Sequence, residues 1–258
     1  GHALGHNILG DEQSLLGFGS ESGKSFMRRF YAPENMVFFS MGRIPFKKIV
    51  QMAESTLSDI AFPMAARNRT APGELLPVSR QIHKDTHQAH VMIGGRGYHA
   101  YDERRTGLYL LNNILGGPGM NSRLNVSLRE RRGLVYNVES NLTSYTDTGT
   151  FCIYFGCDPE DVDSCISLVR KELKQLRDRA LTTAQLHAAK KQIIGQIGVA
   201  SDNFENNALD MGKCFLHYGK YDSREEVYRR IEELTASQLL EIANEVLTEE
   251  YLSQLIYQ

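Results

Sequence analysis

Residues 116–156 contain a helix stop, a short helix and a hairpin in one continuous run, GGPGMNSRLNVSLRERRGLVYNVESNLTSYTDTGTFCIYFG. The opening glycines and proline end one helix, and residues 122–131 predict the next. Two segments, roughly Val135–Ser144 and Thr150–Gly156, are candidate strands of a hairpin. Tyr145–Gly149 between them has the polar residues and the glycine of a hairpin turn. The run therefore predicts a sheet that packs against helices.

Flanking segments add further strands and helices to this pattern. Ala89–Gly95 is a short apolar run closed by glycines, which predicts a strand, and a helix with one apolar side follows it. Asp158-Pro159 predicts a helix start in which the carboxylate caps the helix and proline occupies the first turn. This order of elements predicts an α+β fold rather than a doubly wound sheet. The remaining predicted elements are helices that begin near Thr183, Ser223 and Thr235 and a final strand over Tyr251–Tyr257.

The N-terminal part of the chain predicts a separate unit. An amphipathic helix is expected over Ser20–Phe30, a buried strand over Asn35–Gly42, and a second helix after Pro45. Residues 63–77 contain prolines, a glycine and polar residues without periodicity, which is typical of a linker. We therefore expect a domain boundary within residues 63–77.

Composition excludes several classes of protein. The 258 residues include 29 Lys and Arg against 31 Asp and Glu, and this balance argues against a general nucleic-acid binder. No apolar run approaches the ~18 residues of a membrane span, and the first residues lack the features of a secretory signal. Four irregularly spaced cysteines indicate buried thiols in a reducing compartment. We expect a cytoplasmic location, with the periplasm or the mitochondrial matrix as alternatives, and neither nucleic acid nor membrane as a partner.

The residues alone indicate no metal or nucleotide site. His83, His87 and His90 would stack on one face of a helix, but His90 leads into an apolar β-branched run that predicts a strand. Neither H-E-x-x-H nor H-x-x-E-H occurs, and no G-x-S-x-G is present. The glycines at 116–119 lack the Gly-Lys-Ser/Thr of a phosphate-binding loop. We expect no metal ligand in this chain.

Six short segments, in the order in which they occur, carry a resemblance to a known family. They are L-G-x-x-I-L-G from Leu4, Y-x-P-x-N-M from Tyr31, G-G-P-G-M-N-S-R-L from Gly116, L-R-E-R-R-G-L-V-Y from Leu128, Y-x-D-x-G from Tyr145 and L-T-A from Leu234. Each segment alone is weak evidence for a family, but together the segments span almost the whole chain, and their order and spacing make the combination specific. In this combination the chain resembles the M16 metallopeptidases, the family of pitrilysin, insulin-degrading enzyme and mitochondrial processing peptidase.

The resemblance implies a domain organisation. Residues 1–62 would be the C-terminal remnant of a zinc-bearing peptidase domain, residues 63–77 a linker, and residues 78–258 a complete second domain of the inactive, substrate-side type. Both domains would be α+β, with a mixed and largely antiparallel sheet packed against helices. Members of the family bind zinc through H-x-x-E-H and a distant glutamate, upstream of the segment that corresponds to Leu4–Gly10. The zinc ligands of the parent enzyme would therefore lie outside this chain.

The resemblance also implies two catalytic residues. A family arginine and tyrosine, seven residues apart, correspond to Arg129 and Tyr136, and in the family they reach towards the zinc and the scissile peptide of the opposing half. A guanidinium and a phenol can stabilise the negative charge that develops on the peptide carbonyl oxygen. From the residues alone, Arg129 can also belong to a solvated, charged helix end, and Tyr136 can be a half-buried strand aromatic.

Substrate-binding residues are implied in two places. Gly116, Gly117 and Gly119 match a glycine-rich loop that handles substrate in processing peptidases. The strand that contains Ala89 and Val91 matches an edge to which an extended peptide could add through backbone hydrogen bonds.

The expected function is thus the C-terminal part of a zinc-dependent endopeptidase that hydrolyses peptides or unfolded polypeptides inside a clamshell chamber. This part would act with a second M16 half or subunit, as a homodimer or heterodimer, and would be inactive alone. Two alternatives remain open: a non-catalytic partner or structural subunit of the same fold, and a domain that binds peptides without hydrolysing them.

Overall fold

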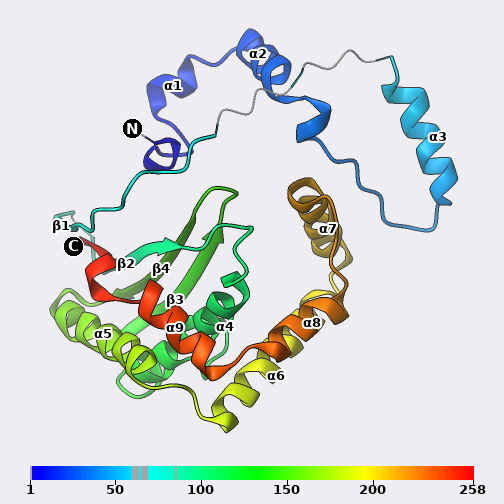
Figure 1. Cartoon of the computed structure of the whole chain (residues 1–258). Helices are drawn as coiled ribbons and strands as arrows, with labels where there is room; N and C mark the ends of the chain where they lie inside the picture. The colour runs from blue at the N-terminus through cyan, green and yellow to red at the C-terminus, as the bar shows by residue number, and fades with distance from the viewer. Residues whose placement is uncertain (1, 60–63, 65–68, 85) are drawn as a thin grey trace. The chain divides into compact units, whose positions relative to one another are not determined.

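The computed structural model describes residues 2–59, 64, 69–84 and 86–258. The chain divides into two compact units (Figure 1). One contains Gly1–Thr70 and Val199–Asp222, and the other contains Ala71–Gly198 and Ser223–Gln258. The predicted division into residues 1–62, a linker over 63–77 and a domain over 78–258 falls partly on positions outside the described ranges, and it stays a prediction.

The larger unit is built on a five-stranded mixed sheet with the strand order β1-β5-β2-β4-β3. β1 (Ser79–Ile82) is parallel to β5 (Ser253–Tyr257), whereas all other neighbours are antiparallel. β2 (Ala89–Gly97) lies in the middle, next to β4 (Gly149–Cys157), and β3 (Val135–Ser144) is the last strand. The predicted α+β fold with a largely antiparallel sheet is confirmed.

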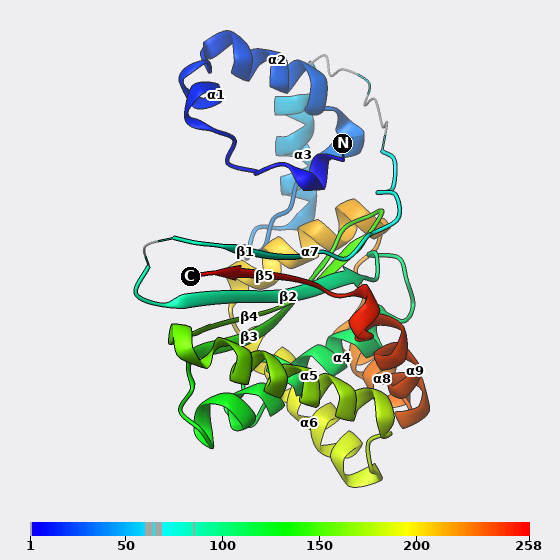
Figure 2. The same cartoon turned by 90° about the vertical axis from the view of Figure 1, so that its left-hand side faces the viewer.

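Helices cover one face of this sheet (Figure 2). Successive side chains of a strand point to opposite faces, and Val91, Ile93 and Phe155 are among those buried in the core. The helices of this unit are α4 (Arg105–Gly116), α5 (Val162–Asp178), α6 (Thr183–Ala200), α8 (Arg224–Glu233) and α9 (Ala236–Val246), with the short η3 (Asn125–Glu130), η4 (Pro159–Asp161) and η5 (Glu249–Tyr251).

Two predicted helix starts are confirmed by their caps. Ser223 Oγ accepts a hydrogen bond from the backbone N–H of Glu226 at 3.2 Å, at the start of α8. Thr235 Oγ1 accepts one from the N–H of Gln238 at 3.2 Å, and the Gln238 side chain accepts the N–H of Thr235 in return. These bonds satisfy backbone donors that the first turn of a helix leaves without intrahelical partners.

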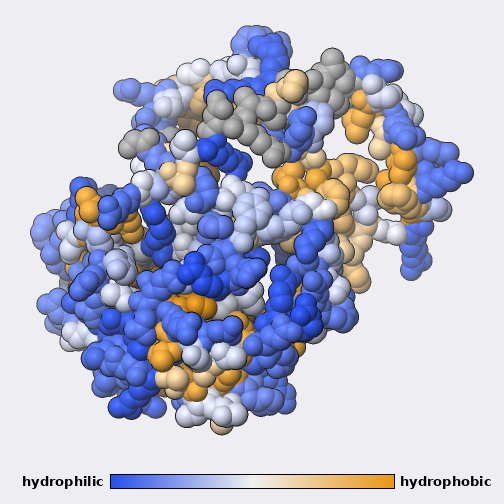
Figure 3. All heavy atoms as spheres, in the orientation of Figure 1, coloured by the Kyte–Doolittle hydropathy of each residue, from blue (hydrophilic) through white to orange (hydrophobic). Residues whose placement is uncertain are grey.

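The smaller unit consists of helices and extended segments. α2 (Ser20–Phe30) and α3 (Phe46–Leu57) occur where the sequence predicts them, whereas α7 (Phe204–Tyr218) was not predicted. Figure 3 shows apolar atoms gathered over α7 and α3. Phe46 of α3 is 82% exposed, and Phe204 of α7 is 72% exposed. The short elements of this unit are η1 (Ala3–Gly5), α1 (Glu12–Leu16) and η2 (Pro33–Asn35).

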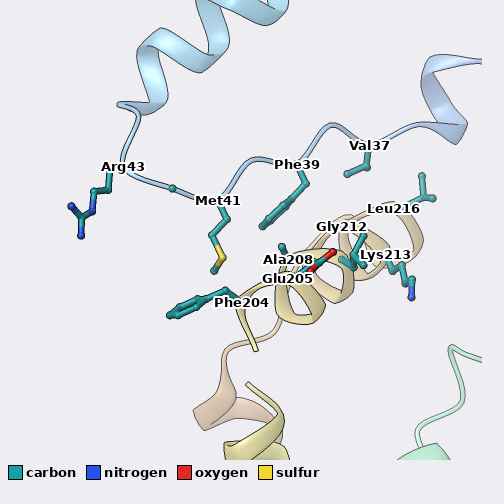
Figure 4. Close-up of a pocket in the computed structure, with 12 residues that line it drawn as sticks. Val37, Phe39, Met41, Arg43, Phe204, Glu205, Ala208, Gly212, Lys213 and Leu216 are labelled. Atoms are coloured by element: carbon teal, nitrogen blue, oxygen red, sulfur yellow. The ribbon is translucent and has the colours of Figure 1, made fainter. Parts of the chain in front are cut away.

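The predicted buried strand over Asn35–Gly42 is wrong. Val37, Phe39 and Met41 line a hollow of about 920 Å³ against α7 (Figure 4), while Phe38 between them is 69% exposed. This segment thus keeps the alternation of an extended chain. A strand also needs a neighbour for its backbone hydrogen bonds, and none of the residues that the structure describes pairs with it.

Among the described residues, no helix combines the length and the apolar composition that a membrane span requires.

Candidate functional site

Arg129 lies in a π-helical segment, η3, which a left-handed glycine follows three residues after its end. The N–H of Arg131 donates to the carbonyl of Val126 at 3.2 Å, which is the five-residue spacing of a π-helix. Gly133 has a φ of +65°, and its N–H donates to the carbonyl of Arg129 at 2.8 Å. A glycine adopts this conformation without steric cost. These bonds fix the backbone of Arg129, while its side chain is exposed.

The charged run at residues 129–132 contains residues with different surroundings. Arg132 Nη1 donates to the carbonyl of Ser127 at 2.7 Å and so satisfies one of the last carbonyls of η3. Within the described part of the chain, no hydrogen bond or ion pair holds the side chain of Arg129. Its guanidinium is therefore available to a group that approaches from solvent.

Tyr136 is the extra residue of a β-bulge at the start of β3. Val135 pairs with Cys157 and Asn137 pairs with Gly156, so Tyr136 has no residue opposite it in β4. A bulge bends its strand and redirects a side chain, and bulges are frequent beside active sites. The Tyr136 side chain is 61% exposed rather than half-buried.

Asp158, which directly follows β4, contacts the phenol of Tyr136. Tyr136 Oη donates a hydrogen bond to Asp158 Oδ1 at 3.3 Å. The negative charge of Asp158 opposes ionisation of the phenol and, with this hydrogen bond, raises the pKa of Tyr136 above its usual value. The prediction that the Asp158 carboxylate caps the following helix is wrong, because it makes no capping hydrogen bond.

The connection between helix and strand brings Arg129 and Tyr136 to the two ends of one turn. η3 ends at Glu130, Gly133 reverses the chain, and β3 begins at Val135. A cation and a phenol that both face solvent can donate to one oxygen that carries developing negative charge. Both side chains are exposed on this one connection, and their joint donation to a ligand stays a prediction.

Gly116 allows α4 to approach β3 closely, and Gly117 allows the chain to turn closely over the last turn of α4. A Cβ on Gly116 would lie 2.8 Å from the backbone N of Ser140 in β3. A Cβ on Gly117 would lie 2.7 Å from the carbonyl oxygen of Asn113. Both glycines are buried, so the structure accounts for them by packing, and their contact with substrate stays a prediction.

The next part of the glycine loop is held by amide side chains of α6. Asn121 Nδ2 donates to Gln192 Oε1 at 2.8 Å, and Gln192 Nε2 donates back to Asn121 Oδ1 at 3.3 Å. A Cβ on Gly119 would lie within 2.8 Å of atoms of both amides. The loop is thus fastened to α6, and the exposed residues Pro118 and Met120 are its accessible part. Whether Gly119 binds substrate stays a prediction.

The expected peptide-binding edge at Ala89 and Val91 is wrong. Val91 pairs with Phe155 of β4 on one side and with Ile256 of β5 on the other. Both side chains are fully buried. A peptide cannot add to a strand whose two sides already have partners, and the ends of the sheet are β1 and β3.

The residues that the structure describes do not fit a zinc site. In the part of the chain that the structure describes, no three His, Cys, Asp or Glu residues lie together as a ligand group. His90, one of the three closely spaced histidines, instead bonds through Nδ1 to Tyr154 Oη at 2.8 Å. The sequence did not identify Asp158 and Gln192 as neighbours of the site. A single acid before a proline indicates a helix start and a single amide on a helix indicates nothing specific, so neither residue points to a functional site.

Comparison with known proteins gives a consistent result. The family model described as "Peptidase M16 inactive domain" matches residues 19–193. An uncharacterized zinc protease of Bacillus subtilis is 29% identical over 255 residues, which is 99% of this chain and 62% of that protein. An uncharacterized zinc protease of Streptomyces coelicolor is 31% identical in an alignment 257 positions long that covers 95% of this chain and 55% of that protein. The chain thus spans a little over half the length of these relatives.

Solved structures share the fold at lower sequence identity. A peptidase M16 inactive domain from Pseudomonas fluorescens matches with a TM-score of 0.88 at 23% identity, over 98% of this chain and 60% of that one. A chain in the structure of complex III2 from Candida albicans matches with a TM-score of 0.87 at 18% identity, over all of this chain and 63% of that one.

Proposed function

The chain belongs to the M16 peptidase family, and from this premise we propose that it is the part of a zinc endopeptidase that binds substrate and stabilises the transition state without holding the metal. One observation carries the proposal. Arg129 and Tyr136 stand at two backbone irregularities, a π-helical segment and a β-bulge, and both side chains are exposed. Such irregularities are frequent at functional sites.

The chemistry assigned to this chain is donation of hydrogen bonds to a peptide carbonyl. Hydrolysis of an amide places negative charge on the carbonyl oxygen in the transition state, and donors held in advance at that position lower the barrier. Arg129 supplies a permanent positive charge and a rigid set of donors. Tyr136 supplies one phenolic hydrogen. The metal would belong to another M16 domain, because the described residues here offer no ligand group.

Substrate would pass the end of the sheet rather than its centre. β3 is the last strand of the sheet and begins at the Tyr136 bulge, whereas β2 is paired on both sides. The accessible tip of the glycine loop, Pro118 and Met120, is a second place for contact with a polypeptide. Ala89 and Val91 have no part in this proposal.

A zinc titration combined with a peptide assay tests this division of labour. The purified chain alone should bind no stoichiometric zinc at micromolar affinity and should not cleave a fluorogenic peptide. Hydrolysis should appear when the chain is joined with the zinc-bearing M16 domain of the same protein or complex, with that domain alone as the control. Stoichiometric zinc on this chain would refute the absence of a metal site.

A non-catalytic or structural subunit is the second candidate. A chain of the complex III2 structure has the same fold. At 18% sequence identity, this similarity is evidence for the fold alone. Relatives named as zinc proteases at about 30% identity favour the peptidase. If the joined protein forms a stable complex with intact zinc but cleaves no peptide, the chain is a non-catalytic or structural subunit.

A further inference from the structure

Asp158 occupies a position at which an aspartate normally caps a helix. It is the residue before Pro159, its backbone is extended at φ −68° and ψ 145°, and η4 and α5 follow it. Aspartate in this position usually accepts a backbone N–H of the first turn. Here the carboxylate makes no such bond and accepts the phenolic hydrogen of Tyr136 instead.

The bulge explains why the two side chains meet. Cys157 is opposite Val135, and the ladder resumes with Gly156 opposite Asn137. Tyr136 is therefore displaced next to the end of β4, where Asp158 follows. Without the extra residue, the register would shift and Tyr136 would point to the other face of the sheet.

We propose that Asp158 is a positioning residue that holds the phenol of Tyr136 in the free protein and gives it up to the substrate carbonyl. A phenol has one hydrogen to donate, so Asp158 and a substrate oxygen exclude each other as acceptors. The distance of 3.3 Å is longer than a typical O–H···O bond. When a substrate oxygen replaces Asp158 as the acceptor, the phenol therefore loses only a long and weak hydrogen bond. This inference rests on the proposed function of Tyr136.

The charges around the phenol support this assignment to Asp158. Arg129 and Glu130 lie at the end of η3, and Arg131 and Arg132 lie in the turn that follows it. Glu139 lies on β3, and Glu160, Asp161 and Asp163 follow Asp158 in the chain. Of these charged groups, Asp158 is the one that raises the pKa of Tyr136, first through its charge and then through its hydrogen bond, with a smaller contribution from burial. The raised pKa of Tyr136 extends the pH range over which its phenol is protonated and can donate.

Carbon-13 NMR of chain labelled at tyrosine Cζ tests the contact directly. The chain contains 12 tyrosines, and the signal that Tyr136→Phe removes identifies Tyr136. Asp158→Asn removes the charge but keeps an acceptor oxygen, so the pKa of Tyr136 should fall towards its usual value. Asp163→Asn, an exposed aspartate in the first turn of α5, is the matched control and should leave the pKa unchanged.

Activity of the joined, zinc-bearing enzyme supplies the second readout. The alkaline limb of the kcat/KM profile should move to lower pH in Asp158→Asn, because a free-enzyme group sets that limb. Asp158→Ala should lower kcat/KM several-fold, and Asp158→Asn should restore most of this loss because its amide oxygen can still accept the hydrogen bond. An alkaline limb that stays in place would contradict the exchange.

The two proposals fail in different ways. If the pKa of Tyr136 is the same in Asp158→Asn and in the unchanged chain, Asp158 does not position Tyr136, whatever the activity of Tyr136→Phe. If the pKa falls but Tyr136→Phe is fully active, the contact exists and the proposed function of Tyr136 is refuted.

Discussion

Arg129→Ala should lower kcat/KM of the joined, zinc-bearing enzyme by about tenfold or more, with zinc content unchanged. A tenfold loss corresponds to about 1.4 kcal/mol of transition-state stabilisation. This is a modest demand on a charged donor, because hydrogen bonds to charged groups contribute about 1.5–3 kcal/mol. The loss should fall on kcat as much as on kcat/KM, since the carbonyl oxygen becomes negative only in the transition state.

Arg131→Ala is the matched control for this experiment. Arg131 is an exposed arginine that directly follows η3, so its removal alters the local charge equally without removing the proposed donor. Arg129→Lys should recover only part of the activity, because lysine keeps the charge and loses the planar set of donors. Equal losses in Arg129→Ala and Arg131→Ala would indicate a general effect of charge and would remove Arg129 from the site.

Gly116→Ala should lower the free energy of unfolding by about 1–3 kcal/mol, the usual cost of excess volume in a packed interior. The added Cβ would lie 2.8 Å from both Ser140 N and Ser140 Cβ, so α4 would have to move away from β3. Ser140 also accepts a hydrogen bond through its carbonyl from Asn112 Nδ2 at 2.8 Å, and movement of α4 would weaken it. The gain in helix propensity, at most about 1 kcal/mol, does not offset this cost.

Gly195→Ala in α6 is the opposite case and serves as the control. Nothing lies within 4 Å of a Cβ built at Gly195, and the residue is exposed within a helix. This change should stabilise the chain by about 0.5–1 kcal/mol. Urea unfolding followed by circular dichroism measures both variants. A neutral Gly116→Ala would show that close packing does not explain this glycine and would favour a contact with substrate.

Local patterns predicted most elements of the larger unit, with β1 (Ser79–Ile82) as a strand that was missed. The hairpin over residues 135–156 and the cap at Thr235 depend on neighbours in the sequence, and both are present. The position of β2 in the sheet was not predictable in this way. Whether a strand lies at the centre or the edge depends on β5, which lies at the far end of the chain, and no local pattern contains that information.

The predicted strand at residues 35–42 failed for a related reason. The prediction was based on a continuous apolar run closed by a glycine, and Val37, Phe39 and Met41 of that run share one side. An apolar run does not supply a pairing partner for a strand. The site shows the same limit. The motif around Arg129 and Tyr136 is visible in the sequence, whereas the bulge and the contact with Asp158 follow from the register between β3 and β4.

The most direct test of the account is kcat/KM of Tyr136→Phe in the joined, zinc-bearing enzyme. This change removes a single oxygen atom from an exposed side chain, so the fold, the zinc content and the association of the two parts should stay as they are. We predict a loss of about tenfold or more, as for Arg129→Ala. Turnover equal to that of the unchanged enzyme would contradict the claim that this turn donates to the reacting carbonyl.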